Sequence, residues 1–173
     1  IDSLNFNPDG TIQKVIPTLR GVGLTNARSH IQIDRYSALQ GKGIGIDYLD
    51  KNNCFAGWRT LFSKSNTALI YNKVDFGNEK VEEVTVRAKS PKGGVLVVRA
   101  DGKKGNIIAK VKIPKSAAWK NVRAQVLHAP LGVHALHVSL QSGADVEVDW
   151  LGFDALPWEK GAFETHQYRN LFA

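Results

Sequence analysis

The chain has 173 residues, of which 43% are hydrophobic and 23% are charged, and its formal net charge is +7. This composition is that of one soluble globular domain and excludes a disordered chain. No apolar run approaches the ~20 residues that a membrane-spanning helix needs, so no membrane partner is expected. The sequence begins at Ile1, contains no methionine and opens on no signal peptide, so we expect a fragment of a longer protein.

The first 29 residues have an irregular character, and we interpret residues 1–29 as a linker or an extension from a preceding catalytic domain. Asn7-Pro8-Asp9-Gly10 is a turn sequence within this head. Residues 30–156 are predicted to form the folded domain. Residues 157–173 depart from the pattern of the folded domain and are interpreted as a linker into a following domain.

Residues 30–156 are predicted to form short strands in succession. Period-two alternation is clear in 31–35, 81–88 and 133–140, where Leu136, Val138 and Leu140 would share the buried face. Pro91–Gly94 and Asp101-Gly102 supply turn signals between such runs, and no convincing amphipathic helix interrupts them. The pattern predicts an all-β fold, a β-sandwich of the jelly-roll kind.

The lysines between Lys103 and Lys120 form a basic stretch, which would permit nucleic-acid binding. Lys110 and Lys112, however, alternate with apolar residues, as in a strand whose outer face is solvated. No nucleic-acid recognition motif accompanies this charge. We therefore expect no nucleic-acid partner.

The sequence offers no catalytic signature. It contains no G-x-S-x-G, no H-E-x-x-H and no phosphate-binding loop, so no enzymatic activity is predicted for this fragment. Cys54, the single cysteine, cannot form an internal disulfide, and a buried inert thiol is favoured over a nucleophile. The histidines lack metal-ligand spacing, and His134 and His137 are expected on strand faces as packing or surface residues.

Three tryptophans are informative about a possible binding site and about the core. Trp58 follows a glycine after a loop, and Trp119 is predicted to lie in a loop between strands. Exposed rings of this kind stack on the apolar faces of sugars, although each ring could instead plug one end of the sandwich. Trp150 alternates with buried positions and is predicted to be structural.

An ordered set of segments resembles a known family. In chain order the segments are Ile31–Ser37, Lys73–Gly77, Gly93–Leu96, Trp119, Gly132–Leu136 and Val148–Phe153. Their order and spacing are similar to those of the family 6 carbohydrate-binding modules over about residues 30–155. The resemblance implies a non-catalytic jelly roll that binds xylan, cellulose or related β-glucans, commonly with a structural calcium ion.

The same resemblance implies a sugar site at the loop end of the sandwich, with Trp58 and Trp119 clasping a sugar ring. The family uses an asparagine at the position of Glu147, and a carboxylate accepts hydrogen bonds but cannot donate them. Either the ligand differs from simple xylan, or this site has weakened and a concave-face site or no site serves instead.

The resemblance also places Gln32, Asp34 and Asp149 at the calcium site. Hard oxygen ligands suit calcium, although the family usually has a glutamate where Asp34 stands. The alternative is a solvated polar edge without a metal.

The flanks carry two short resemblances. Residues 2–15 are similar to the segment after the catalytic propeller of family 43 glycoside hydrolases, and residues 161–173 to the opening of family 8 enzymes that trim xylo-oligosaccharides. The sequence thus predicts a xylan-binding module between two catalytic domains of an extracellular or periplasmic glycoside hydrolase. A structural spacer of the same fold, with its sugar site degraded at Glu147, is the alternative.

Overall fold

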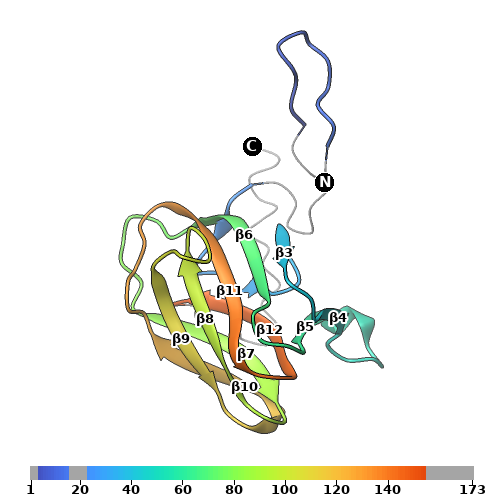
Figure 1. Cartoon of the computed structure of the whole chain (residues 1–173), viewed down its shortest axis with the longest axis vertical. Helices are drawn as coiled ribbons and strands as arrows, with labels where there is room; N and C mark the ends of the chain where they lie inside the picture. The colour runs from blue at the N-terminus through green and yellow to red at the C-terminus, as the bar shows by residue number, and fades with distance from the viewer. Residues whose placement is uncertain (1–3, 16–22, 155–173) are drawn as a thin grey trace.

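The computed structural model describes residues 4–15 and 23–154, and within them the fold is all-β. Two six-stranded sheets face each other in a sandwich (Figure 1). The first sheet runs β1-β6-β11-β8-β9 with β3 also on β6, and the second runs β10-β7-β12-β5-β4 with β2 also on β12. No helix in these ranges is long and apolar enough to cross a membrane.

The strands of the first sheet are β1 (Thr25–Asn26), β3 (Ala38–Gln40), β6 (Ala68–Asp75), β8 (Gly94–Ala100), β9 (Ile107–Ile113) and β11 (Val133–Gly143). Those of the second are β2 (Ile31–Gln32), β4 (Ile44–Tyr48), β5 (Trp58–Phe62), β7 (Glu83–Ser90), β10 (Ser116–Gln125) and β12 (Val146–Phe153). A single 3₁₀ turn, η1 (Cys54–Ala56), joins β4 to β5. These strands confirm the predicted β-sandwich.

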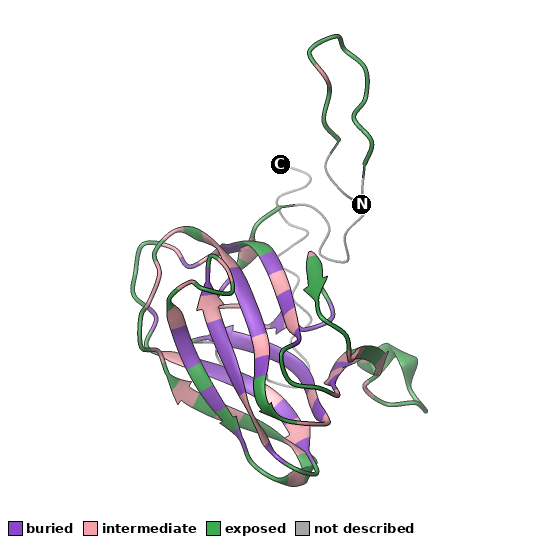
Figure 2. Cartoon of the chain, in the orientation of Figure 1, coloured by how far each residue is buried: buried purple, intermediate pink, exposed green. Residues whose placement is uncertain are grey.

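The core lies between the sheets, where the inward residues of both are buried (Figure 2). Leu136, Val138 and Leu140 of β11 are buried as the alternation predicts, and Trp150 is also buried. On β9 the predicted alternation holds as well, because Lys110 and Lys112 are exposed between buried neighbours. The period-two pattern therefore locates the core face correctly.

Three local predictions were wrong. The strand expected over 31–35 ends after Gln32, because the Arg35 amide turns back to donate to the Gln32 carbonyl at 3.1 Å. Trp119 lies within β10, at a bulge between Ser116 and Lys120, and not in a loop. Cys54 is exposed in η1, so it is not the buried thiol that was expected.

Two parts of the head, residues 4–15 and 23–29, are described by the structure. Phe6 and Ile12 form a bridge around the predicted turn at residues 7–10. Thr25–Asn26 pairs in parallel with β6, and Ala27 is buried, so the sandwich already includes residues before position 30. The linker predicted at 157–173 lies outside the described residues.

Candidate functional site

A cavity of about 380 Å³ opens on the outer face of the first sheet, within the ~300–1,000 Å³ that small-ligand sites occupy. The strand register explains why it forms there. Ser139 at the centre of the face lies opposite Ala68 on one side and Val97 on the other. Because Ala68 and Ser139 are small, the sheet is hollowed between the larger side chains of its neighbours.

Hydrogen-bonding groups line this cavity. Gln40 enters from β3, Asn66 from the β5–β6 loop, and His137, Ser139 and Gln141 from β11 and its end. Gly41 closes one side with a φ of +90°, and a side chain there would come within 3.1 Å of the Asn66 carbonyl oxygen. The tight approach of these two loops sets the wall of the cavity.

His137 is the most unusual of the lining residues. His137 is only 8% exposed, and its Nδ1 is buried without a hydrogen-bond partner among the described residues. Burial lowers the pKa of His137, so the ring is held neutral near pH 7. A buried polar atom without a partner costs the fold stability.

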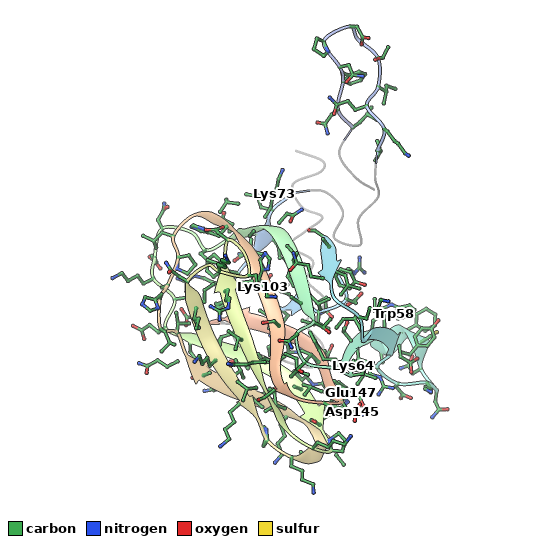
Figure 3. All side chains as sticks on the ribbon, in the orientation of Figure 1. Trp58, Lys64, Lys73, Lys103, Asp145 and Glu147 are labelled. Carbon is green, nitrogen blue, oxygen red and sulfur yellow. The ribbon has the colours of Figure 1, made fainter. Side chains whose placement is uncertain are left out.

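Two cationic side chains also line the cavity. Arg99 lies opposite His137 across β8 and β11, and Lys103 follows in the β8–β9 turn, seen over the first sheet in Figure 3. Arg99 Nη1 donates to the Gly105 carbonyl at 3.2 Å. No described carboxylate forms an ion pair with either cation. These two cations give the cavity a positive charge.

The predicted sugar residue Trp58 lies elsewhere, on the β4–β5 hairpin that projects from the sandwich (Figures 1 and 3). Its ring stacks on Tyr48 at 4.4 Å between centroids, and the two residues are 40% and 37% exposed. Phe55, at the tip of the same hairpin, is 95% exposed. The stacked pair Tyr48 and Trp58 and the separate ring of Phe55 are thus exposed on this hairpin.

Trp119 contacts cations in place of another aromatic ring. The Arg87 guanidinium lies 5.3 Å and the Lys89 ammonium 5.0 Å from the centre of its ring. Cations at this distance are attracted to the ring face. Arg87 is itself paired with Asp149, so this face of Trp119 belongs to a packed ionic surface.

Glu147 is part of the same surface. Its Oε2 pairs with Arg59 and lies 3.3 Å from the Lys89 ammonium, and Arg59 also reaches Asp47 at 3.2 Å. The side chain at the position of the family's asparagine is thus held by two cations of its own chain.

The structure does not bring Trp58 and Trp119 together. They lie on β5 and β10, which are separated by β7 and β12, so three inter-strand spacings or about 14 Å lie between the strands. Alternation along β5 also turns Trp58 to the side opposite Arg59, whereas Trp119 shares the face of Arg87. The clasp of one sugar ring between these two tryptophans stays a prediction, which this strand order does not favour.

The predicted calcium residues do lie together. Gln32 is paired with Trp150, and the Ile33 amide donates to the Asp149 carbonyl at 3.0 Å. Asp34 and Asp149 are only 9% and 5% exposed. Burial raises the pKa of both carboxyls, and the charge of Asp34 further raises that of Asp149 although Arg87 opposes it.

This cluster fits a calcium ion chemically. Two buried carboxylates that repel each other would be stabilised by a divalent cation, and Gln32 adds an amide oxygen. Among the described residues no group of three or more acidic, histidine or cysteine ligands is present. Backbone carbonyls and water would therefore have to complete the coordination.

A second histidine forms an ion pair at the start of β11. His134 Nδ1 lies 2.7 Å from Asp101 Oδ2, and His134 Nε2 lies 2.9 Å from the Leu131 carbonyl oxygen. The Asp101 hydrogen bond raises the pKa of His134. Burial alone would raise the pKa of Asp101, but its bonds with His134 and Ala135 lower it overall.

Asp101→Asn should lower the pKa of His134 toward the ordinary value of 6.5. Because the folded-state pKa of His134 is raised, the pair stabilises the fold below pH 6.5 and this contribution is lost as the pH rises through the raised pKa. NMR titration of the imidazole resonances measures the shift. Asp145→Asn, at the far end of β11, should leave the titration of His134 unchanged.

The comparisons with known proteins agree with this fold. A family model described as carbohydrate binding module (family 6) matches residues 41–155. The module CsCBM6-3 of Clostridium stercorarium, solved with cellobiose, has a TM-score of 0.68 at 21% identity and covers 78% of this chain and 98% of its own. No match is found among the curated proteins.

Two further structures are similar. A family 6 module of Clostridium cellulolyticum, solved with xylose, has a TM-score of 0.65 at 23% identity and covers 75% of this chain and 98% of its own. A family 43 arabinoxylan arabinofuranohydrolase of Bacillus subtilis, solved with cellotetraose, has a TM-score of 0.68 at 19% identity. That match covers 90% of this chain but only 33% of the enzyme.

Proposed function

Because this chain belongs to family 6 of the carbohydrate-binding modules, which bind sugars and catalyse no reaction, we propose that it binds xylan-type chains in the cavity of its first sheet. The observation that carries this proposal is the cavity itself, about 380 Å³ in volume and lined by His137 and other side chains with hydrogen-bonding groups. Gln40 and Ser139 are among these side chains. Sugar hydroxyls, which both donate and accept, would satisfy this mixed set.

The ionic surface around Trp119 supports the choice of the cavity over the loop end. A sugar that stacked on the face of Trp119 that Arg87 or Lys89 covers would have to displace that cation, and both cations hold carboxylates. Trp119 and Glu147 remain the proposed contacts of a second, weaker site. Trp58 with Tyr48 is a separate exposed platform on which a longer chain could stack.

The choice of xylan rests on the ligands and substrates of the similar structures and on the resemblance of residues 2–15 and 161–173 to glycoside hydrolases. One similar module was solved with xylose, and the Bacillus subtilis enzyme acts on arabinoxylan. The match to that enzyme reaches a larger share of this chain than the matches to isolated modules do. This supports a parent protein in which the module adjoins a family 43 catalytic domain. We also propose an extracellular or periplasmic location, because a polymeric substrate is found there.

Calorimetric titration with xylohexaose, arabinoxylan and cellohexaose tests the proposal. Gln40→Ala and His137→Ala should weaken xylohexaose binding by up to about tenfold each, the worth of one hydrogen bond. Trp119→Ala and Trp58→Ala should leave the dissociation constant within about twofold. Because Gln40 is exposed, its variant keeps the test independent of folding.

Two results would contradict this assignment. Loss of binding in Trp119→Ala, with Gln40→Ala unaffected, would return the sugar to the loop end. Tighter binding of cellohexaose than of xylohexaose would overturn the choice of xylan.

The second candidate is a structural spacer, and the ion pairs of Glu147 favour it. A loop-end site closed by Arg59 and Lys89 has no need to bind sugar, and the module would then only hold two catalytic domains apart. If no saccharide gives a heat of binding, the spacer function is the one that remains.

We further propose that Gln32, Asp34 and Asp149 hold a structural calcium ion. The burial of both carboxylates and the repulsion between them support it. A bound calcium ion would supply positive charge that joins the segment after β2 to β12.

A further inference from the structure

The positive charge of the cavity indicates a ligand that is not a neutral sugar. Resting on the proposed function, we infer that the bound saccharide carries a carboxylate, as in a xylan chain substituted with uronic acid. Two cations line the cavity, Arg99 and Lys103, and no acidic side chain lines it. A neutral polysaccharide would leave both charges without a partner.

The geometry of Arg99 suits a carboxylate. The guanidinium has five N–H donors, of which Nη1 is bound to the Gly105 carbonyl. That bond fixes the side chain beside His137, its partner across the strands, while the remaining donors have no partner among the described residues. A guanidinium held in this way can bind a carboxylate through two parallel hydrogen bonds.

The nearby carboxylate of Asp101 does not neutralise the positive charge of the cavity. Asp101 is close enough to His137 to affect its pKa. Its carboxylate, however, is occupied by His134 and by the Ala135 amide at 3.1 Å. Lys110, which lies opposite Val97 on β9, adds a further exposed cation to the same region of the sheet.

The lining contains no phenylalanine, tyrosine or tryptophan. A neutral sugar site depends on ring stacking for much of its affinity, whereas an acidic sugar gains affinity from charge-assisted hydrogen bonds. The cavity is therefore better equipped to recognise a uronic acid together with the hydroxyls of its chain.

The test is a calorimetric titration of the full chain at low salt with three probes. They are xylotetraose carrying one glucuronic acid, the methyl ester of the same oligosaccharide, and tetragalacturonate. The acid should bind about tenfold tighter than its ester, the worth of one charge-assisted pair. Arg99→Gln should reduce this preference to within twofold, and Lys73→Gln, an exposed lysine outside the cavity, should preserve it.

The outcomes separate this inference from the proposed function. Equal binding of acid and ester overturns the inference and leaves xylan binding in place. An equal loss of preference in Arg99→Gln and Lys73→Gln also overturns it, because the effect would then come from net charge. Binding of tetragalacturonate in preference to the substituted xylotetraose overturns the assignment of a xylan backbone. If none of the three probes binds, both this inference and the proposed function are overturned.

Discussion

Calcium should raise the melting temperature of this protein by about 5–10 °C when its free concentration is a hundredfold above the dissociation constant. A ligand at that excess stabilises the folded state by about 2.7 kcal/mol, and a chain of this size gains roughly 2–4 °C for each kcal/mol. The expectation follows from Asp34 and Asp149, whose buried charges repel each other in the absence of a cation. Differential scanning calorimetry in calcium and in EDTA measures the difference.

Asp149→Asn and Asp34→Asn should each abolish most of this calcium-dependent rise. Asp145→Asn is the matched control, since Asp145 is a solvent-accessible carboxylate that pairs with Lys92 on a turn. The readout is the difference between calcium and EDTA within each variant, so a change in baseline stability does not affect it. An unchanged wild-type melting temperature in calcium would mean that Asp34 and Asp149 form a polar edge neutralised by Arg35 and Arg87.

In EDTA the two variants should differ. Burial opposes the charge of Asp34, so its replacement by a neutral amide should cost little. Asp149 is also buried, but its charge pairs with Arg87, so Asp149→Asn removes an ion pair and leaves the guanidinium without its counterion. The larger loss of stability should therefore follow from Asp149→Asn.

Local pattern was sufficient to predict the sandwich. The alternation in β9 and β11 identifies which residues enter the core, because neighbouring side chains of a strand point to opposite faces. The resemblance also identified Asp34 and Asp149 as neighbours, although they are far apart in sequence. The first signal is carried by each short segment itself, whereas the second depends on the order of segments along the chain.

The candidate sugar site could not be predicted in the same way. The order of strands in the second sheet separates β5 from β10 and so does not favour the predicted clasp of Trp58 and Trp119, and strand order is a property of the whole chain. The bulge before Lys120 then turned Trp119 onto the face of Arg87 and Lys89. Between Ser116 and Lys120, β10 carries two residues more than the facing stretch of β7, and such an irregularity leaves no clear mark in the alternation.

The cavity was missed for a related reason. It depends on Ala68 and Ser139 lying in one row across β6 and β11, and on Arg99 lying opposite His137. Each is an unremarkable outward residue when its own strand is read alone. The signal that was available is a small outward residue on each strand, Ala68 at the start of β6 and Ser139 within β11, which becomes informative only when the register is known.

Phe153→Ala should destabilise the domain by about 3–5 kcal/mol, the usual cost of removing a buried aromatic ring. Phe153 is fully buried and packs edge-to-face on Phe76, with ring centroids 5.0 Å apart. Phe55→Ala removes the same ring from the exposed tip of the β4–β5 hairpin and should change stability by less than about 0.5 kcal/mol. Urea unfolding of the two variants compares them directly.

The contrast between the two phenylalanines tests which aromatic rings hold the sandwich and which are available to a partner. Phe153 ends β12, the strand that also carries Glu147 and Asp149, so the loss of its packing should weaken the calcium cluster and the ionic surface together. Phe55 supports neither, and its replacement should leave calcium stabilisation intact. A cost for Phe55→Ala close to that of Phe153→Ala would mean that the hairpin tip packs against the protein in solution.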